Sequence, residues 1–252
     1  MRAGYRRGGM ITSQMTLVYT YTLFLIGRRD CRVEDFTVRN LIARWFFMTA
    51  LTGRYTNSPE TIMEQDLARL RDVKDATGFV AFLDRIISDT LTEDYWNITL
   101  PNELATSSPR SPSLFAYYAA MNLLDARVLF SKMKVSELLD PTMKARKSAI
   151  ERHHLFPKGY LAKLGINELR DTNQIANYAL VEWSDNIDIA DRSPAEYFPR
   201  YAERFSVEEL SQMCYWHALP PGWEQMDYRE FIEARRQSMA AVIREGFKRL
   251  RE

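Results

Sequence analysis

Apolar residues recur at helical spacing along the first half of the chain. Over residues 33–52 large apolar side chains repeat every three or four positions, and Gly53 then closes the segment. A second helix is predicted to start at Ser58-Pro59, because serine caps a helix and proline suits its first position. Further helices are expected at 79–91 and 114–130. The first half is therefore expected to be all helical.

The C-terminal part is also predicted to be helical, apart from one short interruption. Three helix starts share the capping-box spacing, with a serine or aspartate three residues before a glutamate: Ser193, Ser206 and Asp227. The last helix is expected to continue to residue 250. The short stretches 150–156 and 177–183 are apolar, with aromatic and β-branched residues, as strands are. We predict a two-stranded element here, followed by a helix that begins near Ser184.

Residues 15–26 form an apolar run behind Arg2, Arg6 and Arg7, an order that resembles a secretory signal. Three threonines dilute the run, no small-residue cleavage site follows it, and residues 28–30 are charged. The run is also shorter than the roughly 20 apolar residues that span a bilayer. We interpret it as a buried helix and expect no membrane partner.

The composition is that of a globular protein. A chain of 252 residues, 46% of them hydrophobic, can bury about three quarters of its unfolded surface. Its two cysteines, Cys31 and Cys214, lie in no CxxC or Cys/His cluster, which favours a reducing, cytoplasmic location. With 34 basic and 33 acidic residues, the net charge offers no argument for a nucleic-acid partner. Such an argument must rest on local charge.

Basic residues concentrate in one segment, which also contains the chemistry. Residues 141–165 hold six basic side chains and one acidic one. A charge run is usually a solvated helix face. Two of the three histidines, however, are adjacent in this run, in the stretch ERHHLFPK at 151–158. Asn177 heads the second predicted strand, and Asn186 opens the next predicted helix. Together they form a ββα unit that can hold one divalent ion.

This arrangement resembles the HNH, or His-Me finger, nucleases, whose motif has an acidic residue or His, a catalytic His, xxPro, then Asn and a further Asn or His. More specifically, HHLFPK at 153–158, NQIANYAL at 173–180 and DNI at 185–187 are similar to the C-terminal nuclease portion of GmrSD-type, modification-dependent (type IV) restriction proteins. Upstream, TGRY at 52–55 and SPET at 58–61 resemble the helical region before that nuclease. The resemblance covers most of the chain.

The resemblance implies a fold, a division into domains and an activity. The expected fold is mainly α, with a helical domain at 1–140 and an HNH-type nuclease domain with C-terminal helices at 141–252, which contains the inserted ββα-metal motif. The implied activity is metal-dependent endonucleolytic hydrolysis of phosphodiester bonds in DNA, as the nuclease part of a restriction or phage-defence system. Two alternatives stay open: a non-catalytic helical subunit for DNA binding or interaction, and an RNase with the same ββα site.

Motif positions assign a role to each site residue. His154 becomes the general base and His153 a metal ligand, while Asn177 orients the base or braces the loop, and Asn186 is the metal ligand on the helix. The chemistry is consistent, because a neutral imidazole with a pKa near 6.5 can take a proton from water. A divalent ion then supplies positive charge to the phosphate oxygens. Arg152, Lys158 and Lys147 are the first candidates for phosphate contacts.

Two points are left open by the residues themselves. Imidazole at His153, where many HNH enzymes have Asp, leaves the divalent ion undecided among Mg, Mn, Ni and Zn. Adjacent residues of a regular strand face opposite sides, so His153 and His154 need a bend near Pro157, or lie either side of the scissile phosphate. Asp185 and Asp188 are the alternative helix ligands, although charge at a helix start is the commoner explanation.

The resemblance also implies a partner. Proteins of this kind carry an N-terminal domain that hydrolyses nucleotide, and this sequence holds no GxxxxGK[ST] loop. We therefore expect a nucleotide-hydrolysing domain or subunit, absent from this chain, to act with it on DNA. The third histidine, His217, has no evident chemical partner in the sequence and is expected to be structural or on the surface.

Overall fold

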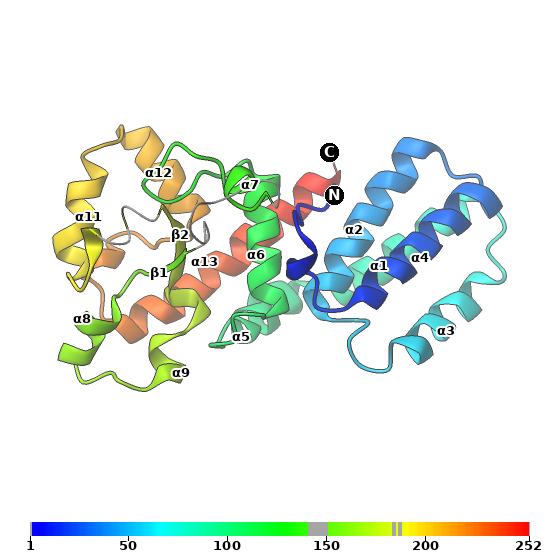
Figure 1. The fold of residues 1–252 in the computed structure, drawn as a ribbon. Helices are drawn as coiled ribbons and strands as arrows, with labels where there is room; N and C mark the ends of the chain where they lie inside the picture. The colour runs from blue at the N-terminus through cyan, green and yellow to red at the C-terminus, as the bar shows by residue number, and fades with distance from the viewer. Residues whose placement is uncertain (1, 141–150, 183–184, 186–187, 252) are drawn as a thin grey trace.

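The computed structural model describes residues 2–140, 151–182, 185 and 188–251, without the side chains of Glu151 and Arg152. These residues are mainly helical and form one two-stranded sheet, so the predicted mainly α class is confirmed. Figure 1 shows the first four helices on one side, and the two strands with the later helices on the other. Helix α6 (Pro112–Leu123) stands between these two groups.

The N-terminal lobe comprises residues 2–91. Its helices are α1 (Gln14–Leu25), α2 (Asp35–Thr52), α3 (Pro59–Leu70) and α4 (Ala76–Thr90), with the short turns η1 (Gly8–Met10) and η2 (Ile26–Asp30). Helix α2 is the centre of the lobe, since it packs against α1, α4 and α6. Its core face includes Leu41, Trp45 and Phe47, all inaccessible to solvent.

Local signals account for most helix ends in this lobe. The Glu34 side chain accepts hydrogen bonds from the first backbone N–H groups of α2, and Gly53 ends that helix in the left-handed conformation (φ 63°). Asp75 caps α4 in the same way as Glu34 caps α2. Helix α3 begins at Pro59 as predicted, but Ser58 has φ 48° and makes no side-chain cap bond. The predicted capping role of Ser58 is therefore wrong.

The TGRY stretch at 52–55 has a structural role. Arg54 forms an ion pair with buried Asp66 on α3 (Nη2 to Oδ1, 2.6 Å), and the Tyr55 hydroxyl donates to the same carboxylate at 3.0 Å. The Arg54 guanidinium also lies over the Trp45 ring. These contacts fix the loop between α2 and α3 and satisfy a buried charge.

The rest of the chain contains short helices, the sheet and the long C-terminal helix. Its elements are η3 (Tyr95–Thr99), α5 (Leu100–Glu103), α6, α7 (Val135–Leu138), β1 (Glu151–His154), α8 (Lys158–Lys163), α9 (Leu169–Thr172), η4 (Ile175–Asn177), β2 (Tyr178–Val181), α11 (Pro194–Ala202), α12 (Val207–Trp216), η5 (Trp223–Gln225), α13 (Tyr228–Lys248) and η6 (Arg249–Arg251). The predicted starts of α11, α12 and α13 are confirmed. Ser206 and Glu209, for example, exchange both hydrogen bonds of a capping box at 3.2 Å each.

Helix α13 connects the sheet to the N-terminal lobe. It runs from beside the strands, packs along α5 and α6, and is followed by η6, which contacts α2 (Figure 1). A Cβ atom at Gly246 would lie 2.5 Å from the Ala120 Cβ, so only glycine allows this close approach of α13 to α6. The helix that ends the chain is therefore part of the core beneath the strands and of the contact with the lobe.

The two predicted strands pair as expected. They are antiparallel, with His153 opposite Ala179 and His154 opposite Tyr178. The predicted helix near Ser184 falls largely on residues outside the described part, although Asp185, Asp188 and Ile189 have helical backbone. The two strands are thus observed, while the complete ββα unit remains a prediction.

One predicted helix is too long. The 114–130 helix ends at Leu123, and the chain turns at Asp125 with φ 54°. Beyond the turn, the Leu129 N–H donates to the Leu180 carbonyl at 2.9 Å, so this segment runs alongside β2. Apolar spacing continued past the turn, but extended pairing with β2 buries those side chains instead.

The apolar run at 15–26 forms α1, but only one face of this helix is buried. Thr16, Thr20 and Leu23 face the core, whereas Val18 and Tyr21 are exposed. The prediction of a buried helix is wrong for that outer face. In the part of the chain that the structure describes, no helix combines the length and apolarity required to cross a bilayer.

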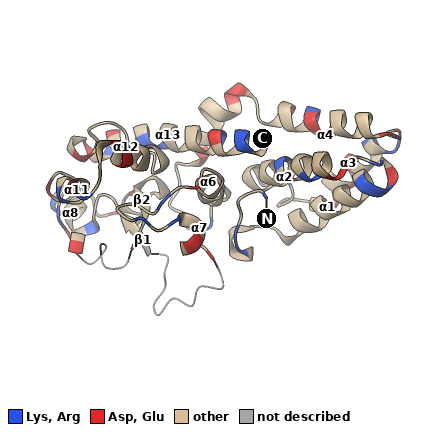
Figure 2. Cartoon of the chain, turned by 90° about the horizontal axis from the view of Figure 1, so that it is seen from above, with Lys and Arg blue, Asp and Glu red and all other residues tan. Residues whose placement is uncertain are grey.

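Charged residues of both signs are distributed over the whole molecule. In Figure 2 the blue and red segments alternate along helices on both sides of α6. This agrees with the nearly balanced composition, 34 basic against 33 acidic residues. Local groups of side chains, not a single charged face, must therefore select any charged ligand.

Candidate active site

The two adjacent histidines lie in β1 and point to opposite faces of the sheet. Both are part of the regular antiparallel register, in which neighbouring side chains alternate. His153 is 3% exposed and faces the interior, with its ring 6.0 Å from that of Tyr197. His154 is partly exposed, and its ring lies 4.8 Å from that of Tyr178. The structure therefore does not aim both imidazoles at one atom.

A side-chain amide determines the tautomer of His154. Its Nε2 lies 3.0 Å from the Asn173 Oδ1. Because a carbonyl oxygen only accepts, Nε2 carries the hydrogen and donates it, and Nδ1 carries the lone pair. Tyr178 packs against the ring from the opposite strand. His154 is thus an oriented, partly exposed imidazole with a defined basic nitrogen.

Asn177 braces the loop that follows His154. Its side chain is inaccessible to solvent and forms a pair of hydrogen bonds with the backbone of Phe156, accepting from the N–H at 2.8 Å and donating to the carbonyl at 3.0 Å. The same amide donates to the Thr172 carbonyl at 3.1 Å. Of the two roles predicted for Asn177, this geometry favours bracing the loop, and it is Asn173 that contacts the His154 ring.

Arg235 of α13 holds the segment that contains Asn177. The guanidinium is fully buried and donates to the carbonyls of Ala176 at 2.6 Å, Tyr178 at 2.8 Å and His217 at 3.2 Å. Ala176 and Tyr178 are the chain neighbours of Asn177. A cation inside the protein thus fixes the backbone on both sides of the amide that braces the loop.

Sequence reasoning missed both Asn173 and Arg235 as site residues. Asn173 is 19 positions from His154, and local periodicity carries no information about that pairing. Arg235 could have been noticed in the sequence, because it lies between Phe231 and Met239 in the apolar stripe of α13. A cation in a core stripe must find buried acceptors, which makes it a candidate for holding irregular backbone.

The face of the sheet that carries His153 is connected by ring contacts and hydrogen bonds to Asp185 and Asp188. Tyr197 lies between His153 and Tyr201 in a row of ring contacts, and it also donates to the Leu155 carbonyl at 2.7 Å. The Tyr201 hydroxyl in turn donates to Asp188 Oδ2 at 2.9 Å. Asp185 forms an ion pair with Arg204 at 3.2 Å. The two aspartates offered as alternative ligands therefore both have protein partners.

Several predicted site residues fall outside the described part of the chain. Lys147 and Asn186 lie there, and so does the side chain of Arg152, whose backbone pairs with Leu180 in the sheet. Lys158 is described, and it is exposed at the start of α8, four residues after His154. Within the described residues, no three His, Cys, Asp or Glu side chains are grouped as metal ligands. His153 with Asn186, completed by water and phosphate oxygens, remains the predicted ion site.

His217 has a structural role, which is one of the two roles expected from the sequence. It is buried, and its Nε2–H donates to the Arg127 carbonyl at 2.9 Å. Burial lowers the pKa of His217 to about 3, against a hydrogen bond that opposes the shift. The folded protein therefore keeps this imidazole neutral, while the unfolded chain protonates it near its ordinary pKa of about 6.5.

Acid should consequently weaken the fold through His217. Between about pH 6.5 and 3 the unfolded chain binds one more proton here, so the free energy of unfolding falls by up to about 1.4 kcal/mol per pH unit. Urea denaturation at pH 7, 6 and 5 would measure the slope. His217→Gln, which keeps a donor near the Arg127 carbonyl, should show a shallower slope than the wild type. Parallel slopes in the two proteins would contradict the assignment.

Comparison with protein-family models, with curated proteins and with solved structures finds no match to this chain. Function is therefore inferred from the site residues themselves. What they provide is an oriented imidazole at the end of β1, a loop braced by a buried amide, and an exposed lysine beside that loop.

Proposed function

We propose that this protein is a metal-dependent endonuclease of the HNH type, which hydrolyses phosphodiester bonds in DNA as the nuclease part of a restriction or phage-defence system. The observation that carries the proposal is the contact between His154 Nε2 and Asn173 Oδ1. It orients an imidazole that is partly exposed, as a general base for water must be.

Proton transfer is the task of His154. An imidazole with an ordinary pKa near 6.5 is neutral at physiological pH and accepts a proton readily. Nδ1 takes the proton of the attacking water, and the hydrogen bond from Nε2–H to Asn173 stabilises the imidazolium that forms. Asn173 is thus a positioning residue for the base.

The loop after His154 needs a rigid backbone, because the base must stay within hydrogen-bond reach of the attacking water. Asn177 bonds both backbone groups of Phe156, and Tyr197 bonds the Leu155 carbonyl. Arg235 holds the backbone on both sides of Asn177 through the carbonyls of Ala176 and Tyr178. This network supports a precise position for His154 relative to a bound phosphodiester.

The proposed ion site uses His153 and Asn186. A divalent ion there (Mg, Mn, Ni or Zn) would act as a Lewis acid toward the phosphate oxygens. Both protein ligands are neutral, so the site would not reduce the charge that faces the substrate. Ring contacts run from His153 through Tyr197 to Tyr201, and the Tyr201 hydroxyl donates to Asp188; these contacts support an ion site on the face of the sheet that carries His153.

Lys158 is proposed to bind the phosphate backbone next to the cleaved bond, together with Arg152 and Lys147. It is exposed and begins α8 directly after the braced loop. Contacts of this kind position DNA without reading its sequence and make affinity dependent on salt. The partner proposed for the full restriction activity is a nucleotide-hydrolysing domain or subunit.

The test is nicking of supercoiled plasmid in the presence of Mg, Mn, Ni or Zn. Wild-type protein should nick DNA only with a divalent ion, and His154→Ala should lower the rate by about a hundredfold or more. Arg170→Ala, an exposed substitution on α9, is the matched control and should nick at the wild-type rate. Equal rates in wild type and His154→Ala would reject His154 as the base.

The same assay separates the alternatives. Cleavage of RNA and not of DNA would indicate an RNase with this ββα chemistry. Absence of cleavage with every ion, with DNA binding retained, would indicate a non-catalytic binding subunit.

Asn173→Asp should move the pH dependence of nicking. A carboxylate at the position of the amide stabilises the imidazolium and raises the pKa of His154, so the base stays protonated up to a higher pH. The acid limb of the rate profile should shift upward by about one pH unit or more. Asn173→Ala, the control, should lower the rate without that shift. An unchanged profile in Asn173→Asp would mean that Asn173 does not act on the base.

A further inference from the structure

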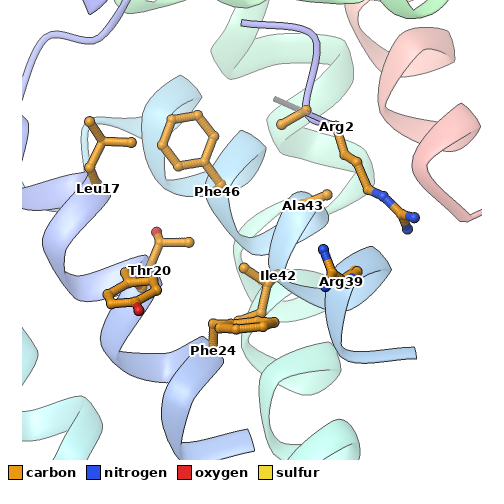
Figure 3. Close-up of a pocket in the computed structure, with 10 residues that line it drawn as sticks. Arg2, Leu17, Thr20, Phe24, Arg39, Ile42, Ala43 and Phe46 are labelled. Atoms are coloured by element: carbon orange, nitrogen blue, oxygen red, sulfur yellow. The ribbon is translucent and has the colours of Figure 1, made fainter. Parts of the chain in front are cut away.

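An apolar groove of about 270 Å³ lies between α1 and α2 in the N-terminal lobe, on the far side of α6 from the strands (Figure 1). Figure 3 shows its apolar side chains across the floor, with Arg2 and Arg39 together on one side. The floor is formed chiefly by Leu17, Phe24, Ile42 and Phe46. Thr20 also lines it, and the Thr20 hydroxyl is buried without a hydrogen-bond partner among the described residues. The groove is therefore almost free of polar atoms.

Exposed aromatic rings extend this surface beyond the groove. Tyr21 is 61% exposed and stacks on Phe24, with 6.3 Å between ring centroids. Phe36, at the start of α2, is 57% exposed. Helix α1 contains no charged residue, and after its first residue, Gln14, its side chains are all apolar or carry a hydroxyl. Rings exposed to this degree are available for stacking.

Arginine side chains alternate with these rings. The Arg39 guanidinium lies 6.0 Å from the centre of the Phe24 ring, and that of Arg2 lies 5.7 Å from the centre of the Phe36 ring. The surface therefore contains two ring–cation pairs, formed by α1, α2 and the N-terminal turn that contains Arg2. Guanidinium groups held against aromatic rings bind planar and anionic groups together.

The local charge is positive although the chain as a whole is nearly neutral. Asp35 pairs with Arg39 at 2.6 Å and with Arg28 at 3.4 Å, and Arg2 adds a third cation. These three arginines, Arg39 first, hold the pKa of Asp35 below its ordinary value. The first 40 residues contain seven arginines, no lysine and three acidic residues. Asp35 and Glu34, whose carboxylate caps α2 at Phe36, offset two of the three arginines, so this group stays positive.

We propose that this surface, formed by Tyr21, Phe24, Phe36, Arg2 and Arg39 beside the groove, binds single-stranded DNA. Unpaired bases stack on the exposed rings, and the phosphates between them contact the arginines, the combination by which proteins bind single strands. Bases within a duplex do not expose their faces to such rings. Because the groove has few polar atoms, bases bind it without hydrogen bonds to their edges, and no sequence preference is expected.

The same scarcity of polar atoms favours DNA over RNA. A ribose 2′-hydroxyl that lies on the apolar floor of the groove would lose hydrogen bonds to water, and only the Thr20 hydroxyl is there to replace one. The site lies in the lobe of α1 and α2, on the other side of α6 from β1, the strand that contains His154 (Figure 1). It does not depend on the proposed hydrolysis. It would hold an unpaired strand on the opposite side of the molecule from the candidate active site.

Fluorescence anisotropy with labelled oligodeoxyuridylate, in EDTA to prevent cleavage, tests the proposal on the full chain. Tyr21→Ala and Phe36→Ala should each weaken binding about tenfold, the scale of one lost stacking contact. Arg2→Ala should weaken binding and reduce the salt slope by about 0.7 for the lost phosphate contact. Exposed residues elsewhere provide matched controls: Tyr215→Ala on α12 and Arg85→Ala on α4 should bind like the wild type. His154→Ala should also bind normally, so loss of nuclease activity and loss of this site are distinguishable.

Three results would overturn the proposal. The first is equal affinity in the ring variants and their controls. The second is equal or tighter binding of a duplex, or of oligouridylate, which differs from the probe only by its 2′-hydroxyls. The third is binding of an acidic amphipathic peptide through Tyr21 and Phe36 by a protein that does not bind the single strand. That result would identify a protein partner instead.

Discussion

Replacing Arg235 by methionine should lower the free energy of unfolding by about 3 kcal/mol. The guanidinium is fully buried and donates to three backbone carbonyls, those of Ala176, Tyr178 and His217. Methionine has a similar length but no donor, so these acceptors would remain buried without partners, each at a cost of about 1 kcal/mol or more. Relief from burying a cation offsets part of this loss. Urea denaturation at neutral pH measures the difference.

Two further variants show whether the effect comes from this geometry. Arg236→Met, at the next position of α13, removes a partly buried arginine whose pair with the exposed Glu233 is 3.8 Å long, and should cost less than about 1 kcal/mol. Arg235→Lys keeps the charge but cannot direct three donors in a plane, so its stability should fall between those of wild type and Arg235→Met. If Arg235→Met is as stable as Arg236→Met, the three carbonyls do not depend on the guanidinium.

Asn177→Asp should destabilise the fold by about 3 kcal/mol, although it changes one atom of the side chain. A carboxylate can still accept the Phe156 N–H, but it cannot donate to the carbonyls of Phe156 and Thr172. Two carbonyl oxygens would then face a buried negative charge without compensation. The free energy of unfolding from urea denaturation at neutral pH checks this value, and plasmid nicking by the folded variant should fall as the loop after His154 loses its brace.

Asn173→Asp is the matched control, because it makes the same chemical change at a partly exposed amide beside the same loop. It should leave the free energy of unfolding within about 1 kcal/mol of the wild type. If both variants have the same stability, the bracing role assigned to Asn177 is incorrect.

Helix starts could be predicted from the sequence because their causes are local. Asp227 caps α13 through backbone N–H groups two and three residues away, and Ser206 bonds Glu209 three residues on. The strand around His154 was found from a short apolar stretch. Prediction failed where a distant partner decided the structure, as at Leu129, which left the predicted helix to pair with Leu180.

The candidate site was predicted in part. The motif predicted His154 and Asn177 on neighbouring strands. The structure has His154 in β1 but Asn177 at the end of η4, one residue before β2, where its side chain bonds the loop after His154. The contact of Asn173 with the base and the support from Arg235 did not follow, because they join residues 19 and 59 positions apart, respectively. The alternation expected of a strand correctly indicated that His153 and His154 face opposite sides.

The sequence by itself determined the starts of most long helices, the approximate positions of the two strands and which side chains can do acid–base chemistry. Spacing, capping and turn residues act over a few positions, so their effects can be predicted from the sequence without knowing the fold. Only the tertiary structure decided the role of each side chain: the tautomer of His154, the neutral state of His217, the task of Arg235 and the exposure of Tyr21. The physical reason is that burial and long-range hydrogen bonds depend on what the rest of the chain places around a residue, and spacing along the sequence does not record this.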